Sequence, residues 1–267
     1  MRFRDFVLAA GAAAVGAGTS GCSRNVSTQV APAISSAMQP ATHSVLERST
    51  QLVVYIAPDW NATSGTLRRF ERSDSRSAWT SVASPIPAVI GRTGLAWADP
   101  SLASEMAQPV KHEGDGKSPA GAFPLDTTFG FAPRADMSWL RMPYSPLVAG
   151  SDCVDDEASV HYNTVVDRSA VPKVDWTSAE HMRTISQYRI GVIVGYNAAP
   201  PTPGRGSCIF LHIWGGPAST TAGCTAMDAG ELEALMRWLD ARRRPVIVQL
   251  PAAEYERLRG AWSLPAL

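Results

Sequence analysis

Two residues in the last quarter of the chain, His212 and Cys224, have side chains that could do covalent chemistry together. His212 interrupts residues 207–214, an apolar run rich in β-branched and aromatic residues that predicts a buried strand. A Gly-Gly-Pro turn at 215–217 ends the run, and a loop leads on to Cys224. If the chain folds back, the imidazole can take the thiol proton and the thiolate can attack a carbonyl. The alternative is two buried core residues, since Cys is among the most buried residue types.

A strongly patterned helix is predicted soon after Cys224. Asp228 suits the N-cap, and Glu231 three residues later completes a capping box. Apolar residues then recur on one helical face, at Leu232, Leu235, Met236 and Leu239. We therefore predict a helix over 228–240 with Cys224 near its N-terminus. Partial positive charge there would favour a thiolate, and free N–H groups would receive an oxyanion.

Two ordered motifs resemble a known family. Thr221-Ala-Gly-Cys224, with His212 upstream on a strand, resembles the His…Ser/Thr-x-Gly-Cys signature of the L,D-transpeptidases. Residues 111–124, Lys-His-Glu-Gly-Asp-Gly-Lys-Ser-Pro-Ala-Gly-Ala-Phe-Pro, resemble the same family's "gDGkTPaGxF" strand and turn. The chain departs from the family at Ala226, where many members have an Arg that bears on substrate carboxylate binding.

The resemblance implies a fold, an activity and roles for single residues. The fold would be mainly β with a few helices, an L,D-transpeptidase-type β-sandwich or mixed sheet with a helix after the catalytic Cys. Cys224 would form a thioester with a peptidoglycan stem peptide, and His212 would act as acid and base. Backbone N–H groups at Gly223 and Cys224 would stabilise the oxyanion, and Thr221 would orient His212. This chemistry requires no metal or organic cofactor.

The acyl acceptor stays open at this point: an amine of a second stem gives transpeptidation, and water gives carboxypeptidase activity. Two other classes of protein remain as alternatives. One is a metal-dependent cell-wall peptidase that uses His112, His161 and His212 with acidic residues. The other is a non-catalytic peptidoglycan-binding lipoprotein of the same fold.

Other segments are expected around the cleft. Two glycines frame Asp115 in residues 113–117, which predicts a tight turn with positive φ. The acidic run at 151–157 is predicted as a polar loop that flanks the cleft, because it lacks the paired spacing of a metal site. Tyr162 and Asn163, which follow this run, are weaker candidates for substrate binding. Residues 175–182 are predicted to form a short helical turn.

Residues 1–22 have the pattern of an export signal. A basic start precedes an apolar run at 6–17, which is too short for a typical membrane span. The run ends at Thr19-Ser-Gly-Cys22, which resembles a lipobox and predicts lipidation of Cys22. The alternative is an ordinary signal peptide cut nearby.

Residues 23–49 are rich in Ser, Thr, Ala, Gln and Pro and predict a flexible tether between a membrane and the domain. Residues 50–267 form the expected catalytic domain. Many Pro and Gly residues and short apolar runs predict a β-rich architecture, with strands that include 51–57 and 246–250. We therefore expect an exported protein of the periplasm or cell envelope, tethered to a membrane surface by its lipid anchor.

Charge and cysteine content bear on nucleic-acid binding and on disulfide formation. The chain has 24 Lys+Arg and 24 Asp+Glu, so composition gives no electrostatic case for nucleic acid. With Cys22 lipidated and Cys224 free, Cys153 and Cys208 remain of the four cysteines, and we predict that they form a disulfide. Two free thiols are the alternative, and Cys153 is a rival nucleophile without a neighbouring glycine or patterned helix.

Overall fold

The structure is a computed structural model, and it describes residues 45–105 and 107–267. The expected signal peptide with Cys22 and most of the expected tether lie outside the described residues. The predicted end of the tether at residue 49 is wrong. Residues 45–48 are helical, Leu46 is buried in the core, and the Arg72 guanidinium donates to the Leu46 carbonyl. The folded unit therefore includes residues before Thr50.

The described residues form mostly strands. In chain order these are β1 (Gln51–Ala57), β2 (Ser64–Glu71), β3 (Thr80–Ser81), β4 (Ile86–Val89), β5 (Leu95–Trp97), β6 (Ser118–Gly130), β7 (Tyr144–Pro146), β8 (Ser151–Val154), β9 (Val165–Asp167), β10 (Ala179–His181), β11 (Ile190–Val194), β12 (Phe210–Ile213), β13 (Thr225–Met227) and β14 (Val246–Pro251). The longer helices are α2 (Ala229–Trp238) and α3 (Ala252–Arg259). Short 3-10 helices are η1 (Pro100–Leu102), η2 (Arg134–Met137), η3 (Met182–Thr184), η4 (Ser186–Arg189) and η5 (Ala241–Arg243).

The main sheet closes on itself. Its strand order is β1-β14-β6-β11-β12-β13-β4-β2, and β2 pairs back with β1. Parallel pairs such as β1 with β14 and β12 with β13 occur among antiparallel ones, so the sheet is mixed. The mainly β prediction is confirmed, but the sheet is a closed, barrel-like one rather than two stacked sheets. Closure leaves no free edge along these strands.

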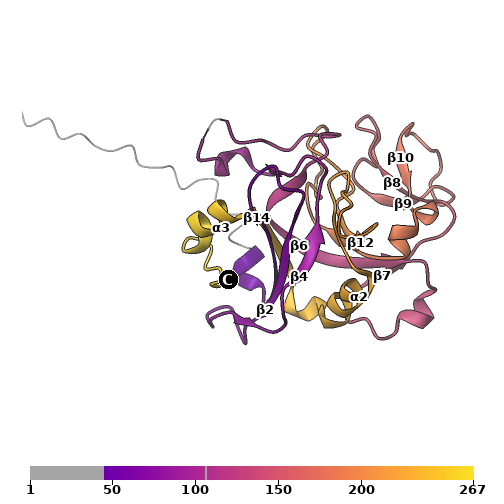
Figure 1. Cartoon of the computed structure of the whole chain (residues 1–267). Coiled ribbons are helices and arrows are strands. Elements are labelled where there is room, and N and C mark those ends of the chain that lie inside the picture. Colours follow the sequence, from indigo (N-terminus) through magenta and orange to yellow (C-terminus); the bar gives the residue numbers. More distant parts are fainter. Residues whose placement is uncertain (1–44, 106) are drawn as a thin grey trace, which may run out of the picture. The chain divides into compact units, whose positions relative to one another are not determined.

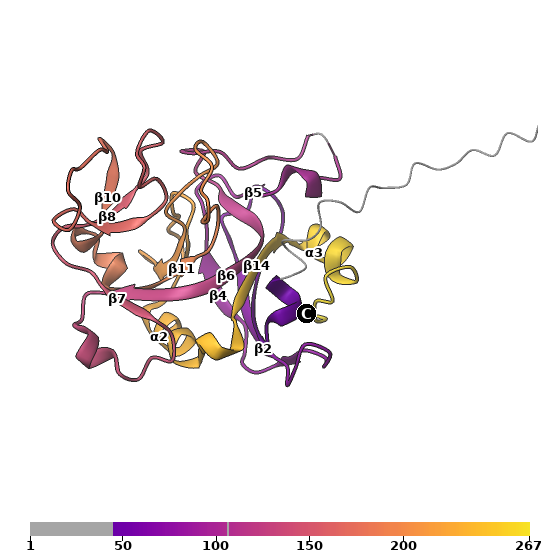
Figure 2. The same ribbon diagram turned by 180° about the vertical axis from the view of Figure 1, so that it is seen from behind.

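The core fills the space that the closed sheet and its covering helices enclose. The predicted strands at 51–57 and 246–250 are confirmed as β1 and β14, and both are almost entirely buried. Continuous apolar runs are typical of such strands because both faces are covered. Helix α3 packs against β14 and β1, and α2 packs against β11 and β12. Figures 1 and 2 show these two helices on different sides of the sheet.

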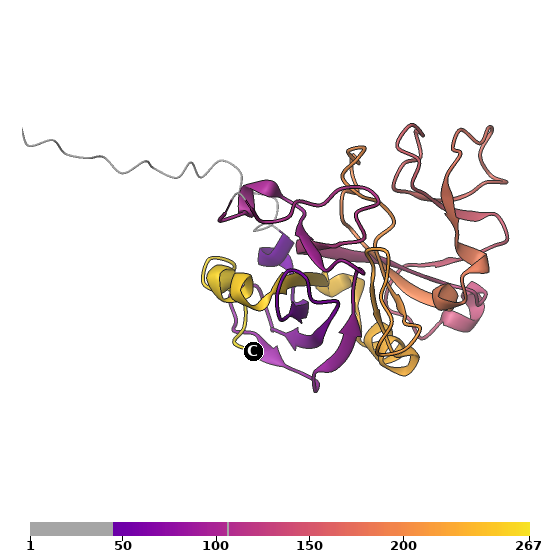
Figure 3. The same ribbon diagram turned by 45° about the horizontal axis from the view of Figure 1, so that its top comes forward.

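A second, three-stranded sheet has the order β10-β8-β9. In Figure 1 it lies on the side of β12 away from α3, and in Figure 3 its orange strands are again far from the yellow helix of the C-terminal end. The predicted helical turn at 175–182 is wrong, because β10 pairs antiparallel with β8 there. The acidic run likewise begins as the buried strand β8 rather than as a loop. Asp152 is buried in it because three donors satisfy its carboxylate, from Arg168, Trp176 and His181.

One covalent bond joins the small sheet to the main sheet. Cys153 of β8 and Cys208, just before β12, form a disulfide with a Cα–Cα separation of 6.0 Å, which is the pairing expected from the sequence. The bond closes a loop of 55 residues that contains β9, β10 and β11. The disulfide thereby fixes the position of the small sheet beside β12.

Replacement of Cys153 and Cys208 together by Ser is expected to lower the free energy of unfolding by about 3–4 kcal/mol, because a loop of this length is no longer closed in the unfolded chain. Urea unfolding of the two proteins measures the loss. Reductant should lower the midpoint of the wild type and leave that of the double variant unchanged. An equal midpoint in the two proteins without reductant would contradict a stabilising disulfide.

Candidate active site

The pairing of β12 with β13 places His212 and Cys224 on one face of the sheet. The strands are parallel, with Leu211 opposite Thr225 and His212 opposite Ala226. Cys224 immediately precedes β13 and shares the face of Ala226, since side chains alternate along a strand. The thiol and imidazole therefore project from neighbouring strands to the same side, two positions apart. The sequence predicted this proximity, but the structure records no hydrogen bond between the two side chains.

The Cys224 thiol is almost completely buried, with 5% of the residue exposed. Its Sγ donates to the Cys208 carbonyl and accepts from the Phe210 backbone N–H, both at 3.3 Å. Burial raises the pKa of the thiol well above its usual value, and the negative charge of Glu180 raises it further. The Phe210 N–H opposes both effects because it stabilises a thiolate. In the resting structure the sulfur is therefore a neutral thiol.

The imidazole of His212 is held in one tautomer. Its Nδ1 lies 2.8 Å from the Ile213 carbonyl oxygen, which can only accept, so Nδ1 carries the proton. Nε2 is then the basic nitrogen. Burial lowers the pKa of His212, which keeps the ring neutral near pH 7. A neutral imidazole with a free Nε2 is the form that accepts a proton from a thiol.

Thr221 has a different role from the expected one. Its hydroxyl donates to the Cys224 carbonyl at 2.6 Å and accepts from the Gly223 N–H at 3.1 Å. The prediction that Thr221 orients His212 is wrong, because the Ile213 carbonyl does so. The Ser118 hydroxyl also donates to the Cys224 carbonyl, at 3.1 Å. These bonds fix the peptide that carries the thiol.

The expected placement of Cys224 at a helix N-terminus is also wrong. Strand β13 separates it from α2, which starts at Ala229 with Asp228 as N-cap, as predicted. Helix-dipole stabilisation of a thiolate therefore does not apply, since the effect falls off within one turn. The Gly223 N–H, expected to bind an oxyanion, is occupied by Thr221. A Cβ at Gly223 would lie 3.0 Å from the Lys117 carbonyl oxygen, so the close approach of these segments requires glycine here.

A cavity of about 150 Å³ opens beside the thiol. It is lined by residues of the Cys224 loop and by Ser207 to Ile209. Charged residues from four other segments complete the lining: Arg92, Lys111 with Glu113, Asp155, and Glu180. The cavity therefore gives the buried sulfur a neighbouring space that contains both cations and carboxylates.

The predicted glycine turn at 113–117 is confirmed and borders this cavity. Gly114 and Gly116 have φ values of 69° and 68°. Asp115 holds the turn together, because its carboxylate accepts from Lys111 Nζ at 2.7 Å and from two backbone N–H groups. Lys111 is thereby paired, whereas no salt bridge or side-chain hydrogen bond of Arg92 is found among the described residues. Arg92 is the cavity's available cation.

Two residues of the site, Tyr188 and Glu180, were not found from the sequence. The Tyr188 ring lies edge-on to the His212 ring, with 5.2 Å between centroids, and its hydroxyl donates to Glu180 Oε2 at 2.6 Å. Burial raises the pKa of Glu180 to about 7, and the charges of Asp155 and Glu113 act in the same direction, while the Tyr188 hydrogen bond opposes them. The one available signal was that Tyr188 lies just before the apolar run at 190–194.

Tyr162 and Asn163 support the cavity from outside and do not line it. The Tyr162 hydroxyl donates to Glu113 Oε2 at 2.5 Å and accepts from the Gly206 N–H at 3.2 Å. Asn163 accepts from the Cys208 N–H at 2.9 Å and donates to two backbone carbonyls near residue 196. Both side chains hold the segment that leads into β12, and their predicted contact with substrate stays a prediction.

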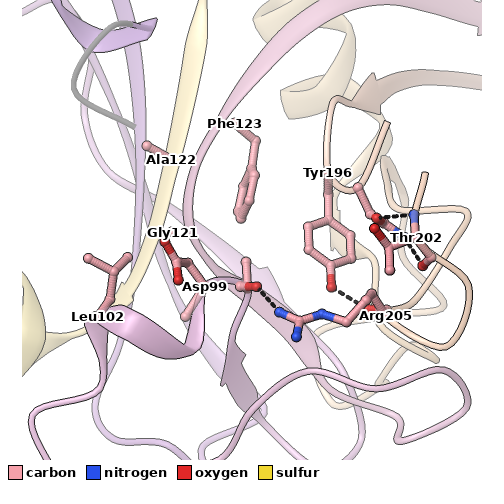
Figure 4. A pocket seen from close by; sticks show the side chains of 11 residues that line it. Asp99, Leu102, Gly121, Ala122, Phe123, Tyr196, Thr202 and Arg205 are labelled. Atoms are coloured by element: carbon pink, nitrogen blue, oxygen red, sulfur yellow. Dashed lines mark hydrogen bonds between the residues drawn. The ribbon is translucent and has the colours of Figure 1, made fainter. Parts of the chain in front are cut away.

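A larger cavity of about 380 Å³ contains neither His212 nor Cys224. Figure 4 shows the rings of Phe123 and Tyr196 beside each other, above the Arg205 guanidinium. This guanidinium donates to the Ala98 carbonyl, and the Tyr196 hydroxyl donates to the Arg205 carbonyl. This cavity is lined by neither a thiol nor an imidazole, so the smaller cavity at Cys224 is the better candidate for cysteine chemistry.

The rival metal site is not assembled. Among the residues that the structure describes, no three His, Cys, Asp or Glu side chains are grouped so as to hold a metal ion. His161 packs edge-on against Trp176 instead, and His181 bonds to Asp152. The same part of the chain contains no helix long and apolar enough to span a bilayer.

Comparison of the chain with protein-family models, with curated proteins and with solved structures found no match. The resemblance to the L,D-transpeptidases therefore rests on the two motifs quoted above.

Glu180 is expected to make stability depend on pH. Its folded pKa of about 7 exceeds the ordinary value of 4.5, so its contribution is present below about pH 4.5 and is lost as pH rises through 7. Relative to a Glu180→Gln variant, the wild type should lose on the order of 2–3 kcal/mol of unfolding free energy across that range. Urea unfolding of both proteins at several pH values measures the difference, and a constant difference would contradict the raised pKa.

Proposed function

We propose that the protein is a thiol-dependent acyltransferase, an L,D-transpeptidase that acts on peptidoglycan stem peptides through Cys224 and His212. The observation that supports this most is the shared sheet face of a thiol and a neutral imidazole, beside a cavity that both cations and carboxylates line. The fixed Nδ1–H leaves Nε2 as the base. This is the minimum apparatus for cysteine nucleophilic catalysis.

In the proposed first step, His212 Nε2 takes the Cys224 proton as the sulfur turns from the Cys208 carbonyl toward the cavity. The thiolate attacks the peptide carbonyl before a terminal D-amino acid, and a C–S bond forms as the carbonyl becomes an oxyanion. The C–N bond then breaks, the imidazolium gives its proton to the leaving amine, and a thioester remains. An amine of a second stem, or water, attacks the thioester and releases Cys224. No step requires a metal or organic cofactor.

Arg92 is proposed to bind the carboxylate of the donor peptide. Many L,D-transpeptidases have an Arg where this chain has Ala226, which is fully buried here and lies opposite His212. Arg92 lines the cavity from a different segment, and its backbone N–H donates to the Thr221 carbonyl at 2.9 Å. The backbone of Arg92 is thereby joined to the loop that carries Cys224. A guanidinium is well suited to bidentate binding of a carboxylate.

The setting proposed for this activity is the cell envelope. The signal-like residues 1–22, lipidation of Cys22 and the tether up to residue 44 would place the domain in the periplasm, attached to a membrane and near peptidoglycan. A disulfide between Cys153 and Cys208 is in keeping with an exported protein. Nucleic acid is not a proposed partner, because the chain has no net charge.

One observation favours a second candidate, a non-catalytic lipoprotein that binds peptidoglycan. The Cys224 thiol is buried and donates a hydrogen bond to the Cys208 carbonyl rather than to His212. In this alternative the cavity binds a stem peptide without reaction. The two proposals differ in whether a covalent adduct forms.

Replacement of Cys224 by Ala is expected to abolish both a thioester adduct with a tetrapeptide stem and release of the terminal D-amino acid. His212→Gln should lower turnover by about 10²–10⁴-fold, the usual effect of a lost general acid–base. Mass analysis of enzyme and products measures both effects. Cys22→Ser, which leaves the domain intact, is the control and should retain activity. Stem binding without any adduct in the wild type would favour the second candidate, and turnover by the Cys224→Ala variant would exclude this mechanism.

A further inference from the structure

The hydroxyl of Tyr188 has two possible acceptors for its single proton, the Glu180 carboxylate and the Cys224 sulfur. It donates to Glu180 Oε2 at 2.6 Å. It is also close enough to the Cys224 sulfur for a hydrogen bond between them to lower the pKa of the thiol. One phenolic O–H can donate to one acceptor well at a time. The protonation state of Glu180 therefore determines whether the Tyr188 hydroxyl can donate to the Cys224 sulfur.

Tyr188 is held rigidly in this position. The residue is 5% exposed, and its ring makes edge contacts with Phe129, Phe210 and His212 at centroid distances of 5.9, 5.4 and 5.2 Å. Such contacts fix the ring plane, so the hydroxyl cannot follow a moving partner. The ring also covers one side of the His212 imidazole.

Glu180 reaches the site from the small sheet. It is the central residue of β10 and lies opposite Cys153, whose disulfide partner Cys208 supplies the carbonyl bonded to the Cys224 sulfur. The disulfide thus connects the small sheet to the segment before β12, and the Glu180–Tyr188 hydrogen bond connects it to η4. The Glu180 carboxyl lines the Cys224 cavity.

The cavity also holds polar atoms that the protein leaves unpaired. Asp155 Oδ1 is buried without a hydrogen-bond partner. Ser207 is 8% exposed, and its Oγ has no partner of good geometry, although it lies near enough to the Tyr162 hydroxyl to lower the pKa of that tyrosine. Both residues line the same cavity as Glu180. Unpaired buried polar atoms are rare, and these two are available to a ligand that enters the cavity.

We propose that Glu180 and Tyr188 are positioning residues of the Cys224 site, in which the protonation state of Glu180 decides whether the Tyr188 hydroxyl donates to the carboxylate or to the sulfur. When Glu180 carries a proton, the carboxyl O–H donates to the tyrosine oxygen, and the tyrosine O–H is free to stabilise a Cys224 thiolate. When Glu180 is ionised, Tyr188 donates to the carboxylate, and the thiolate loses a donor and faces a negative charge.

The charges around Glu180 set where this change occurs. Glu113 and Asp155 face it from the glycine turn and from the end of β8, and both favour its protonated form. Arg92 and Lys111 line the same cavity, and the Lys111 charge is compensated by Asp115. Burial, together with the two carboxylates, raises the pKa of Glu180 to about 7. The change therefore falls near neutral pH, and a cationic or carboxylate ligand in the cavity would shift it.

This inference deepens the proposed function, since it concerns the same thiol, but its test does not depend on any substrate. The rate of alkylation of Cys224 by iodoacetamide is measured between about pH 5.5 and 9, on the peptide that carries this residue. In the wild type the logarithm of the rate should rise less steeply around pH 7, as Glu180 ionises. Glu180→Gln keeps a donor to the tyrosine oxygen and removes the charge. Its rate should rise without that change of slope and exceed the wild-type rate at pH 8–9 by about tenfold, as for a fall of one unit in the thiol pKa.

Two further variants separate positioning from folding. Tyr188→Phe keeps the ring contacts and removes the hydroxyl, so in the Glu180→Gln background it should lower the alkylation rate again. Glu157→Gln, an exposed carboxylate on the segment after β8 that does not line the cavity, should leave the profile unchanged. Circular dichroism melting checks that each variant is folded.

A Glu180→Gln profile parallel to that of the wild type would overturn this inference, as would failure of Cys224 to react in that variant. If the alkylation profiles behave as expected but no stem peptide forms a thioester, the proposed function fails and the positioning roles stand. If stem peptides are turned over while the Glu180→Gln profile is parallel to that of the wild type, the proposed function stands and the positioning roles fail.

Discussion

The parallel pairing of β12 with β13 is the contact on which the site depends. It sets the register that brings Cys224 to the same sheet face as His212, although a loop of several residues separates the strands. The pairing also lets the Phe210 backbone N–H reach the sulfur. Because side chains alternate along a strand, a shift of one residue in this register would move the thiol to the opposite face. The hydroxyls of Thr221 and Ser118 oppose such a shift by binding the Cys224 carbonyl.

Burial affects the Cys224 thiol and the His212 imidazole in opposite ways, since it raises the pKa of the thiol and lowers that of the imidazole. Cys224 is 5% exposed, and its thiol donates a hydrogen bond to the Cys208 carbonyl. Burial raises the pKa of the thiol, so the thiolate forms less readily. The same burial keeps His212 neutral and able to act as a base. A low-dielectric site also strengthens each hydrogen bond that a thiolate or oxyanion later receives. In the proposed mechanism the resting arrangement would therefore be an inactive one, with a neutral thiol and a neutral imidazole.

Regular elements were predictable from the sequence because local patterns specify them. The apolar run of β1, the Asp228 cap of α2 and the glycines around Asp115 each encode their own conformation, and all three were recovered. The role of Glu180 was not recoverable, because it arises from the pairing of β10 with β8, which no local pattern encodes. Sheet closure, which depends on the non-local pairing of β1 with β14, was missed for the same reason.

The link between Cys153 and Cys208 ties the maturation of the site to the redox state of its surroundings. In a reducing compartment the two sulfurs stay apart, and the small sheet that carries Glu180 has only non-covalent attachments to β12. Oxidation fixes the wall of the cavity and the Cys208 carbonyl that accepts from the Cys224 thiol. Formation of the Cys153–Cys208 bond would therefore complete the geometry around the Cys224 sulfur, and an oxidising environment would favour that step.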